Sequence, residues 1–339
     1  MSLNSIGVVA IGRNEGERLK ACFDALKAQL SERSHIVYVD SGSTDNSIDL
    51  VRKMGGIVIE LDAAKPFTAA RARNAGLTYL TKHFPTLKYI QFVDGDCELS
   101  PGWLAEAYQC LEKNPQLAIV CGQRKEISPE ASIYNQYTDL EWYKPPGEEV
   151  DACGGDALIR VKAIQAVEGY NSALICGEEP EMCIRLRRLN WKICRLDRIM
   201  VFHDADMQRF SEWWKRAVRG GWAVSEGFAM YGQAPEKYMA HRYVSGWVWG
   251  GLLPGLALLG ILYTHGWSLL LLLLYPVLVL RIFRYCRQTN GYKLADSAVY
   301  AVLCTLSKFA QAAGQLQYWL TRWQRRTPLL IEYKRTAVK

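Results

Sequence analysis

Strand-like and helix-like segments alternate along the first hundred residues of this 339-residue chain. Short runs rich in valine and isoleucine are separated by longer stretches in which apolar residues recur at helical spacing. The expected strands are residues 6–11, 35–39, 56–61 and 87–93. This alternation predicts a doubly wound α/β fold with right-handed helical crossovers. In an open sheet of this kind, ligands bind at the carboxyl ends of the strands.

The fourth apolar run ends in two carboxylates, Asp94 and Asp96, with Gly95 between them. Hard cations such as Mg²⁺ or Mn²⁺ prefer oxygen ligands and are commonly shared with substrate phosphates. A glycine at this place lets the turn form and lets a ligand approach the backbone. The pair therefore predicts a site for a metal and a diphosphate, the alternative being an ordinary Asp-Gly surface turn.

Other acids follow the neighbouring strands. Asp40 ends the second strand, so it should open onto the same sheet edge as Asp94 and accept from a base N–H or a ribose hydroxyl. Glu15, after the first strand, is placed for similar work. Asp45 begins a helix, where capping is its expected role.

Two pairs of arginines are candidates for binding a diphosphate. Arg71 and Arg73 lie at the start of the third helix, where cations oppose the helix dipole, so a purely structural use is disfavoured. Guanidinium groups bind phosphates in a bidentate manner. Arg216 and Arg219 are one turn apart on a later amphipathic helix. They could clamp the leaving diphosphate or lie on lipid head groups.

Four short motifs together resemble those of family 2 glycosyltransferases, which have the GT-A fold, a doubly wound mixed sheet. The motifs are residues 13–15, 39–45, 70–76 and 93–96. The resemblance covers roughly residues 5–225 and implies a nucleotide-sugar donor, a UDP- or GDP-sugar. It implies that Asp40 lies near the base, Asp94 near the ribose and the metal, and Asp96 on the metal. It also places Asn74 in the donor site.

Residues 177–185 resemble the acidic acceptor-side motif of the same family. In that motif the second acid is the catalytic base, here Glu179, with Glu178 as the alternative. Pro180 suits the first turn of a helix. A carboxylate just before it is kept ionised by the helix dipole and can take a proton from a hydroxyl. The alternative is an acidic helix cap.

Two further segments match parts of the family pattern. Gly154, Gly155 and Asp156 resemble its small-residue acceptor segment. His203 follows a strand and resembles the third metal ligand of some members, although a lone histidine is more often structural.

The last third of the chain has the composition of a membrane anchor. Residues 244–263 and 267–283 are apolar segments close to bilayer length, joined by residues 264–266, with basic residues beyond both outer ends. The positive-inside rule predicts a hairpin with both ends in the cytoplasm. A buried hairpin of a soluble protein is the alternative.

Residues 297–320 carry one apolar stripe with basic residues at both ends. This pattern favours an interfacial amphipathic helix, with a third span left open. The net charge of +7 comes largely from basic residues beside apolar segments, which favours membrane over nucleic acid. The expected domains are a catalytic domain, a hairpin and an interfacial helix with a basic tail, at residues 1–230, 231–293 and 294–339.

The sequence thus predicts an inverting, metal-dependent glycosyltransferase at the plasma (inner) membrane, with its catalytic domain in the cytoplasm. The acceptor is expected to be a lipid-linked saccharide, for cell-surface polysaccharide or glycolipid synthesis. One alternative is sugar transfer onto polyprenyl phosphate or another lipid. Another is a nucleotide-binding membrane module without turnover. We see no signal peptide, and the scattered cysteines suggest reduced thiols.

Overall fold

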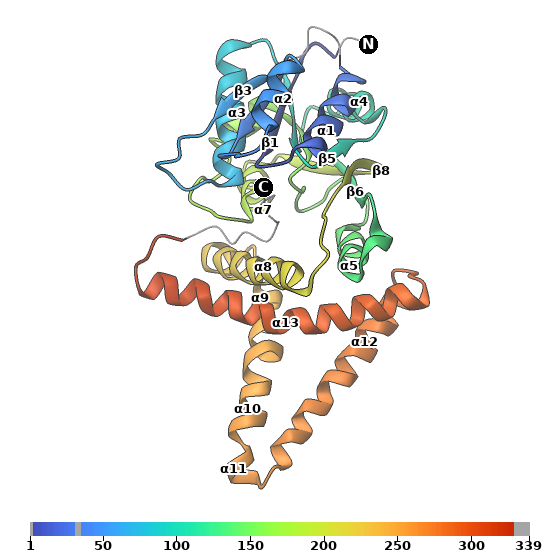
Figure 1. Ribbon diagram of the computed structural model, residues 1–339, viewed down its shortest axis with the longest axis vertical. Helices are drawn as coiled ribbons and strands as arrows, with labels where there is room; N and C mark the ends of the chain where they lie inside the picture. Colours follow the sequence, from blue (N-terminus) through green and yellow to red (C-terminus); the bar gives the residue numbers. More distant parts are fainter. Residues whose placement is uncertain (1–2, 31–34, 329–339) are drawn as a thin grey trace. The chain divides into compact units, whose positions relative to one another are not determined.

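The computed structural model describes residues 3–30 and 35–328. The described residues of 3–128 and 141–205 form one compact unit, and residues 129–140 and 206–328 form a second. The first unit is an α/β unit, and the second is helical (Figure 1).

An eight-stranded mixed sheet forms the first unit, in the order β3-β2-β1-β4-β7-β6-β8-β5. The four strands expected from the sequence are parallel to one another, which confirms the predicted α/β arrangement. They are β1 (Ile6–Gly12), β2 (His35–Asp40), β3 (Ile57–Glu60) and β4 (Tyr89–Asp94). The remaining strands bring in antiparallel pairs. They are β5 (Cys97–Leu99), β6 (Leu117–Glu126), β7 (Ala157–Arg160) and β8 (Lys192–His203).

Helices cover this sheet, and one of them approaches it very closely. They are α1 (Glu17–Lys27), α2 (Ser47–Lys53), α3 (Ala69–His83), α4 (Trp103–Lys113), α6 (Val161–Ala166) and α7 (Glu178–Arg188). A Cβ added at Gly76 of α3 would lie 2.4 Å from a methyl carbon of Val9 on β1. Thr68 caps the same helix by accepting the backbone N–H of Arg71. These contacts fix the start of α3, from which Arg73 reaches the sheet edge.

Some expected boundaries were wrong. The sequence of residues 125–150 predicts an irregular loop, but the segment contains the end of β6, a short 3-10 helix (Pro129–Ala131) and α5 (Ile133–Trp142). The overlooked signal is Ser132, whose hydroxyl accepts the backbone N–H of Asn135 as a helix cap. The sequence predicts two short strands at residues 191–196 and 199–202, but β8 is continuous, because shifts in its register with β6 absorb the irregularity.

The second unit is built around α13 (Leu294–Trp323), which packs against α8 (Phe210–Tyr231), α9 (Ala240–Trp247) and α12 (Leu274–Gln288). The crossing of α8 and α13 has no room for side chains. A Cβ at Gly221 would lie 2.1 Å from the carbonyl oxygen of Gln311, and one at Gly314 would lie 2.0 Å from that of Val218. Such close backbone contact through small residues is typical of helices that associate in membranes.

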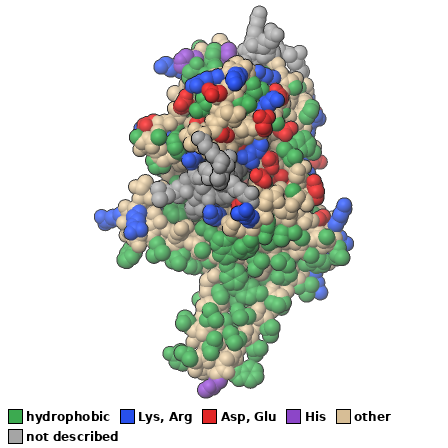
Figure 2. All heavy atoms as spheres, in the orientation of Figure 1, with side chains coloured by type: hydrophobic (Ala, Val, Ile, Leu, Met, Phe, Trp, Pro, Cys, Tyr) green, Lys and Arg blue, Asp and Glu red, His purple; other side chains and the backbone are tan. Residues whose placement is uncertain are grey.

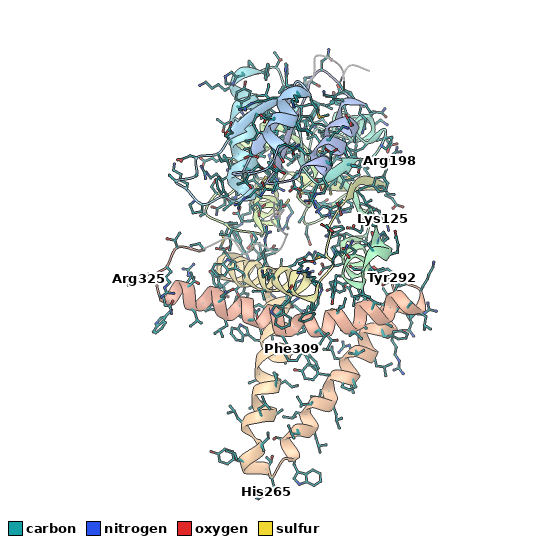
Figure 3. All side chains as sticks on the ribbon, in the orientation of Figure 1. Lys125, Arg198, His265, Tyr292, Phe309 and Arg325 are labelled. Carbon is teal, nitrogen blue, oxygen red and sulfur yellow. The ribbon has the colours of Figure 1, made fainter. Side chains whose placement is uncertain are left out.

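The expected hairpin contains η2 (Val248–Leu252), α10 (Leu253–Leu259), α11 (Ile261–Thr264) and η3 (Trp267–Leu273), followed by α12. The chain reverses at His265 and Gly266, both with positive φ, as the predicted link required (Figure 3). Trp267–Gln288 is the one helix of the described chain that is long and apolar enough to cross a membrane. The first predicted span is interrupted by the π-turn of η2 next to Pro254, which lacks the N–H of a regular helix. Apolar side chains are exposed on both arms, and hydrophobic side chains gather on the visible face of this part of the molecule (Figure 2).

Candidate active site

The carboxyl ends of β1, β2 and β4 bring the predicted acids together at one edge of the sheet. In the parallel registers, Gly12 of β1 lies opposite Asp40, and Ile11 lies opposite Asp94. The two acids therefore end the strands that flank β1, one residue apart in register. The fold places the two carboxylates as the strand pattern predicted.

Asp40 is buried and binds the loop that follows it. One carboxylate oxygen accepts the N–H groups of Gly42 and Ser43, at 2.9 and 2.8 Å. The other accepts the hydroxyl groups of Ser43 and Tyr38, at 2.5 and 3.1 Å. Asp40 thus sets the shape of the loop on which a nucleotide base would rest, and its contact with a base stays a prediction.

The turn after β1 is fastened to the same loop. The side-chain oxygen of Asn14 accepts the N–H of Thr44 at 2.7 Å, and the hydroxyl of Ser47 accepts the N–H of Glu15 at 3.2 Å. Asp45 accepts the N–H of Ser47 at 3.0 Å, in a turn that precedes α2; the N-cap residue of this helix is Asn46, one position after the expected Asp45. Glu15 is consequently buried beside the Asp40 loop.

Arg73 links the sheet edge to helix α7. Its guanidinium is 2 % exposed and donates to Glu178 at 2.6 Å and to Asp94 at 2.8 Å, with Glu179 at 3.3 Å. Three carboxylates offset the cost of burying this cation near a helix start. Its partners in the structure are therefore acids of the protein, and a contact with diphosphate remains a prediction.

The neighbours of Arg73 hold loops in place. The guanidinium of Arg71 donates to the backbone carbonyls of Asp62, Lys65 and Pro66. The side-chain amide of Asn74 exchanges two hydrogen bonds with the backbone of Tyr170, at 2.6 and 2.9 Å. Both residues stand at the sheet edge predicted for the donor, but the contacts seen are structural.

The two acids that begin α7 differ in exposure. The side chain of Glu178 is 4 % exposed, whereas that of Glu179 is 17 % exposed. Burial and then the charge of Glu178 raise the pKa of Glu179, the charge of Arg73 opposes this rise, and the resulting pKa is about 7. A carboxylate with a pKa near 7 is suited to act as a general base. The structure therefore distinguishes Glu179 as the available acid and Glu178 as the anchor of Arg73.

Gly155 allows the three charged groups to meet. A Cβ at this position would lie 2.6 Å from the Arg73 guanidinium, 3.0 Å from Asp94 and 3.1 Å from Glu179. A Cβ at the preceding residue, Gly154, would meet nothing within 4 Å. The glycine at 155 is thus required by packing in the site.

Asp156 supports Asp94 in the structure, and its predicted contact with the acceptor stays a prediction. It is fully buried and accepts the backbone N–H of Asp94 at 2.9 Å. Arg124 donates to Asp156 and, at 3.3 Å, to Asp94. Burial raises the pKa of Asp156, and the guanidinium of Arg124 opposes that rise. Sequence reasoning missed Arg124, because it lies within β6, third from its end, and no motif marks it.

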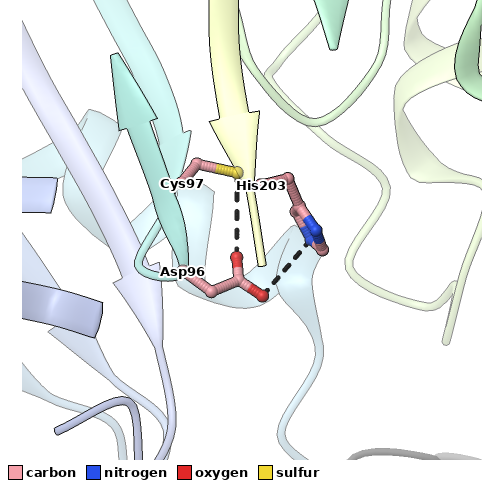
Figure 4. A group of neighbouring side chains, drawn as sticks. All are labelled: Asp96, Cys97 and His203. Atoms are coloured by element: carbon pink, nitrogen blue, oxygen red, sulfur yellow. Dashed lines mark hydrogen bonds and ion pairs between the residues drawn. The ribbon is translucent and has the colours of Figure 1, made fainter. Parts of the chain in front are cut away.

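Asp96 and His203 are neighbours in the structure. Antiparallel pairing of β5 with β8 places Cys97 opposite His203, and the His203 Nε2 lies 3.3 Å from a carboxylate oxygen of Asp96 (Figure 4). Two ligands of one octahedral ion at normal bond lengths are about 3 Å apart, so these buried donors fit a divalent cation. Among the described residues, Cys97 completes one cluster with them and a second with Asp94 and Asp156.

Asp94 is less suited to hold the same ion. Its two oxygens accept from Arg73 and Arg124, whose positive charges oppose a further cation. The geometry therefore favours Asp96 and His203 as ligands, and the metal role of Asp94 stays a prediction.

Arg216 and Arg219 lie one turn apart on α8, in the helical unit, and both are half-buried. Trp213 and Trp222, on the inner face of the same helix, are buried. The predicted role of the two arginines at the diphosphate stays a prediction.

Comparison with known proteins defines the class. The sequence model described as glycosyl transferase family 2 matches residues 7–167. The uncharacterized glycosyltransferase YibD of Escherichia coli K12 is 29% identical over 102 residues, which cover 30% of this chain and 28% of that protein. The matched family range ends before Glu178, Glu179 and His203.

One solved structure shares the fold, and a second is similar at a lower score. The mannosyltransferase PcManGT of Pyrobaculum calidifontis, in complex with GDP-Man and Mn²⁺, has a TM-score of 0.62 at 15% identity, covering 92% of this chain and 87% of that one. Residues 1–349 of S. aureus TarS in complex with UDP-GlcNAc match with a TM-score of 0.49 at 14% identity, covering 96% and 93%. Residues 7–167 therefore form a glycosyltransferase family 2 domain, and the chain has the fold of PcManGT.

Proposed function

We propose that the protein is an inverting, metal-dependent glycosyltransferase that moves a sugar from a UDP- or GDP-sugar to a lipid-linked saccharide at the cytoplasmic face of the plasma membrane. The observation that carries the proposal is the position of Glu179. This partly exposed carboxylate begins α7 and is linked through one guanidinium to Asp94 at the sheet edge. The acceptor base and the donor edge are thereby held in one network.

The donor would lie along the sheet edge. Asp40 shapes the loop for the base, and Asp94, held by Arg73 and Arg124, faces the ribose. Asp96 and His203 would hold Mg²⁺ or Mn²⁺, which neutralises the charge of a diphosphate when bound. The solved complex of PcManGT contains GDP-Man and Mn²⁺, which supports this donor and metal class.

Glu179 supplies the proton acceptor for the attacking hydroxyl. A sugar hydroxyl has a high pKa, so it needs a base, whereas a phosphate acceptor is already an anion and needs none. The raised pKa of Glu179 matches work near neutral pH. This observation favours a saccharide hydroxyl over polyprenyl phosphate as the acceptor. Attack in a single displacement inverts the anomeric centre.

The helical unit supplies the membrane contact in this proposal. Apolar side chains remain exposed along both arms of the hairpin and on one face of α13, including Val302, Leu306, Leu316, Trp319 and Trp323. Exposed apolar area on this scale marks an interaction surface. An interfacial α13 beside a hairpin explains it, and suits an enzyme of surface polysaccharide or glycolipid synthesis.

A donor screen tests the proposal. Purified full-length protein would be incubated with UDP- and GDP-sugars, Mn²⁺ and a polyprenyl-diphosphate-linked saccharide, and both nucleotide release and sugar transfer would be measured. We expect acceptor-dependent transfer from one donor, lost in excess EDTA and in Asp96→Asn. Glu98→Gln, two residues along and outside the metal cluster, is the matched control and should stay active. Full activity in EDTA would contradict the metal-dependent mechanism.

A further inference from the structure

A groove of about 500 Å³ lies between α12 and α13 in the helical unit. Its walls are almost entirely apolar, and they come from both helices, chiefly from Tyr275, Leu280 and Phe283 on α12 and from Val302, Leu306 and Phe309 on α13. The one aliphatic hydroxyl in the wall, that of Thr305, donates to the carbonyl of Ala301 at 2.8 Å. The groove therefore has little with which to bind a polar molecule.

The shape of the groove suits a chain rather than a compact ligand. The helices are joined by residues 289–293, and the groove extends between them from Phe283 and Ala298, near this connection, to Tyr275 and Phe309. At the far end, Tyr275 and Phe309 stack with ring centroids 5.3 Å apart, and the Tyr275 hydroxyl donates to the carbonyl of Trp249 (Phe309 is labelled in Figure 3). An apolar trough with an aromatic end results.

The surroundings indicate hydrocarbon as the occupant. The α12 wall belongs to Trp267–Gln288, the helix with the length and composition of a membrane span. Leu280 and Val302 in the walls are 48% and 45% exposed. Covering such side chains with an apolar chain is favourable, whereas water in the groove would find almost no polar partner.

Positive charge lies at one end of the same helix. Arg281, Arg284 and Arg287 occupy the last two turns of α12, and Arg284 follows Leu280 by one turn on the same face. Guanidinium groups bind phosphate oxygens well, and basic residues at this level attract anionic head groups. An apolar trough beside an arginine cluster is complementary to a lipid with a phosphate head.

We propose that this groove holds the hydrocarbon chain of the lipid that carries the acceptor saccharide, with its phosphate or diphosphate beside the arginines of α12. The inference rests on the proposed function, since a lipid-linked acceptor is the substrate that the groove would hold. The groove then recognises the hydrocarbon chain of the acceptor lipid, while the sugar is recognised elsewhere in the protein.

Two matched variants test the groove in full-length protein in nanodiscs. Val302→Trp fills the trough, and Val277→Trp places the same side chain on α12 at a residue that is 61% exposed and outside the groove wall. Transfer would be measured to one saccharide carried on undecaprenyl diphosphate or on farnesyl diphosphate. Photolabelling with a diazirine-bearing undecaprenyl phosphate would measure binding without turnover.

We expect Val302→Trp to raise KM for the undecaprenyl acceptor about tenfold or more, which losing contact with about two methylene groups would already produce. The farnesyl acceptor, donor hydrolysis and the Val277→Trp variant should stay close to wild type. The label should fall on α12 and α13 and be displaced by undecaprenyl phosphate.

Equal kinetics and equal labelling in the two variants would overturn the inference. So would displacement of the label by phosphatidylglycerol alone, which would show that bulk lipid fills the groove. If wild-type protein transfers sugar to no lipid acceptor but the groove labelling is specific, the proposed function fails and the lipid-chain site stands.

Discussion

Replacing Glu179 by glutamine should separate catalysis from folding. The amide cannot take a proton, and general-base help is worth about 10²–10⁴-fold, so turnover with a hydroxyl acceptor should fall by that factor. Donor binding should stay near wild type, because Arg73 keeps Glu178 and Asp94 as partners. Steady-state transfer and calorimetry with the nucleotide sugar measure the two effects.

The pH profile gives the second part of this prediction. Only the deprotonated carboxylate is a base, and the pKa of Glu179 is about 7. The kcat/KM of the wild type should therefore reach half of its maximum near that pH and about a tenth of its maximum one pH unit below it. The Glu179→Gln variant should lack this limb. A wild-type profile that is flat from acid to neutral pH would refute the assignment.

The free energy of unfolding should depend on pH in the opposite direction to activity, falling as the pH rises. The native pKa of Glu179 is raised from 4.5 to about 7, so protonation favours the folded state. That contribution is present below about pH 4.5 and is lost as the pH rises through about 7, at a cost of at most about 3 kcal/mol. Glu179→Gln should thus unfold at higher denaturant concentration than wild type at alkaline pH.

Glu178→Gln is the matched control. It removes a nearly buried partner of a nearly buried guanidinium, so it should destabilise the protein by roughly 3 kcal/mol. Denaturant unfolding of both variants at one alkaline pH compares them directly. If Glu178→Gln abolishes turnover in a protein of normal stability while Glu179→Gln is active, the two roles are exchanged.

Three further tests probe packing and topology. Gly155→Ala should lower kcat about tenfold or more, because its Cβ would displace the bridging guanidinium of Arg73. Gly154→Ala has open space around its Cβ, so it should fold and bind donor normally. Transfer kinetics of the two variants test this difference. Gly314→Ala should cost about 1–3 kcal/mol in thermal or denaturant unfolding, because its Cβ meets backbone of α8, and Gly255→Ala, which meets nothing, should cost far less. Cysteine at His265, in a background without reactive thiols, should react with an impermeant reagent from outside the cell; reaction only after permeabilisation would contradict the hairpin.

The strand ends were predictable because the signal is local. Apolar runs that stop at an acid place Asp40 and Asp94 at one edge whenever the strands are parallel, and the registers show that they do. The turn at His265 was also predictable from a local signal, because a short polar link between two apolar helices needs a tight turn. Helix α5 was missed although Ser132 carries a capping signal, since its apolar residues do not stand out from a polar stretch.

The partners of Arg73 and Arg124 could not be predicted from the sequence. Arg73 meets Glu178 across 105 positions, and Arg124 meets Asp94 across 30. These contacts depend on the order in which β4, β7 and β6 pair, and nothing in the local sequence gives that order. A charge pattern near a helix start indicated only that Arg73 is not an ordinary surface residue.

The burial of Arg73 explains why two adjacent acids differ. A buried guanidinium needs a carboxylate that is equally buried, and Glu178 fills that place at 2.6 Å. Glu179 contacts the same cation at 3.3 Å while part of its side chain stays open, so it is held in position without being fully neutralised. Since Asp94 contacts the other nitrogen of that guanidinium, any change of charge at the donor edge is felt at the base. The network that fixes the geometry of the site is therefore also the one that sets the protonation of Glu179.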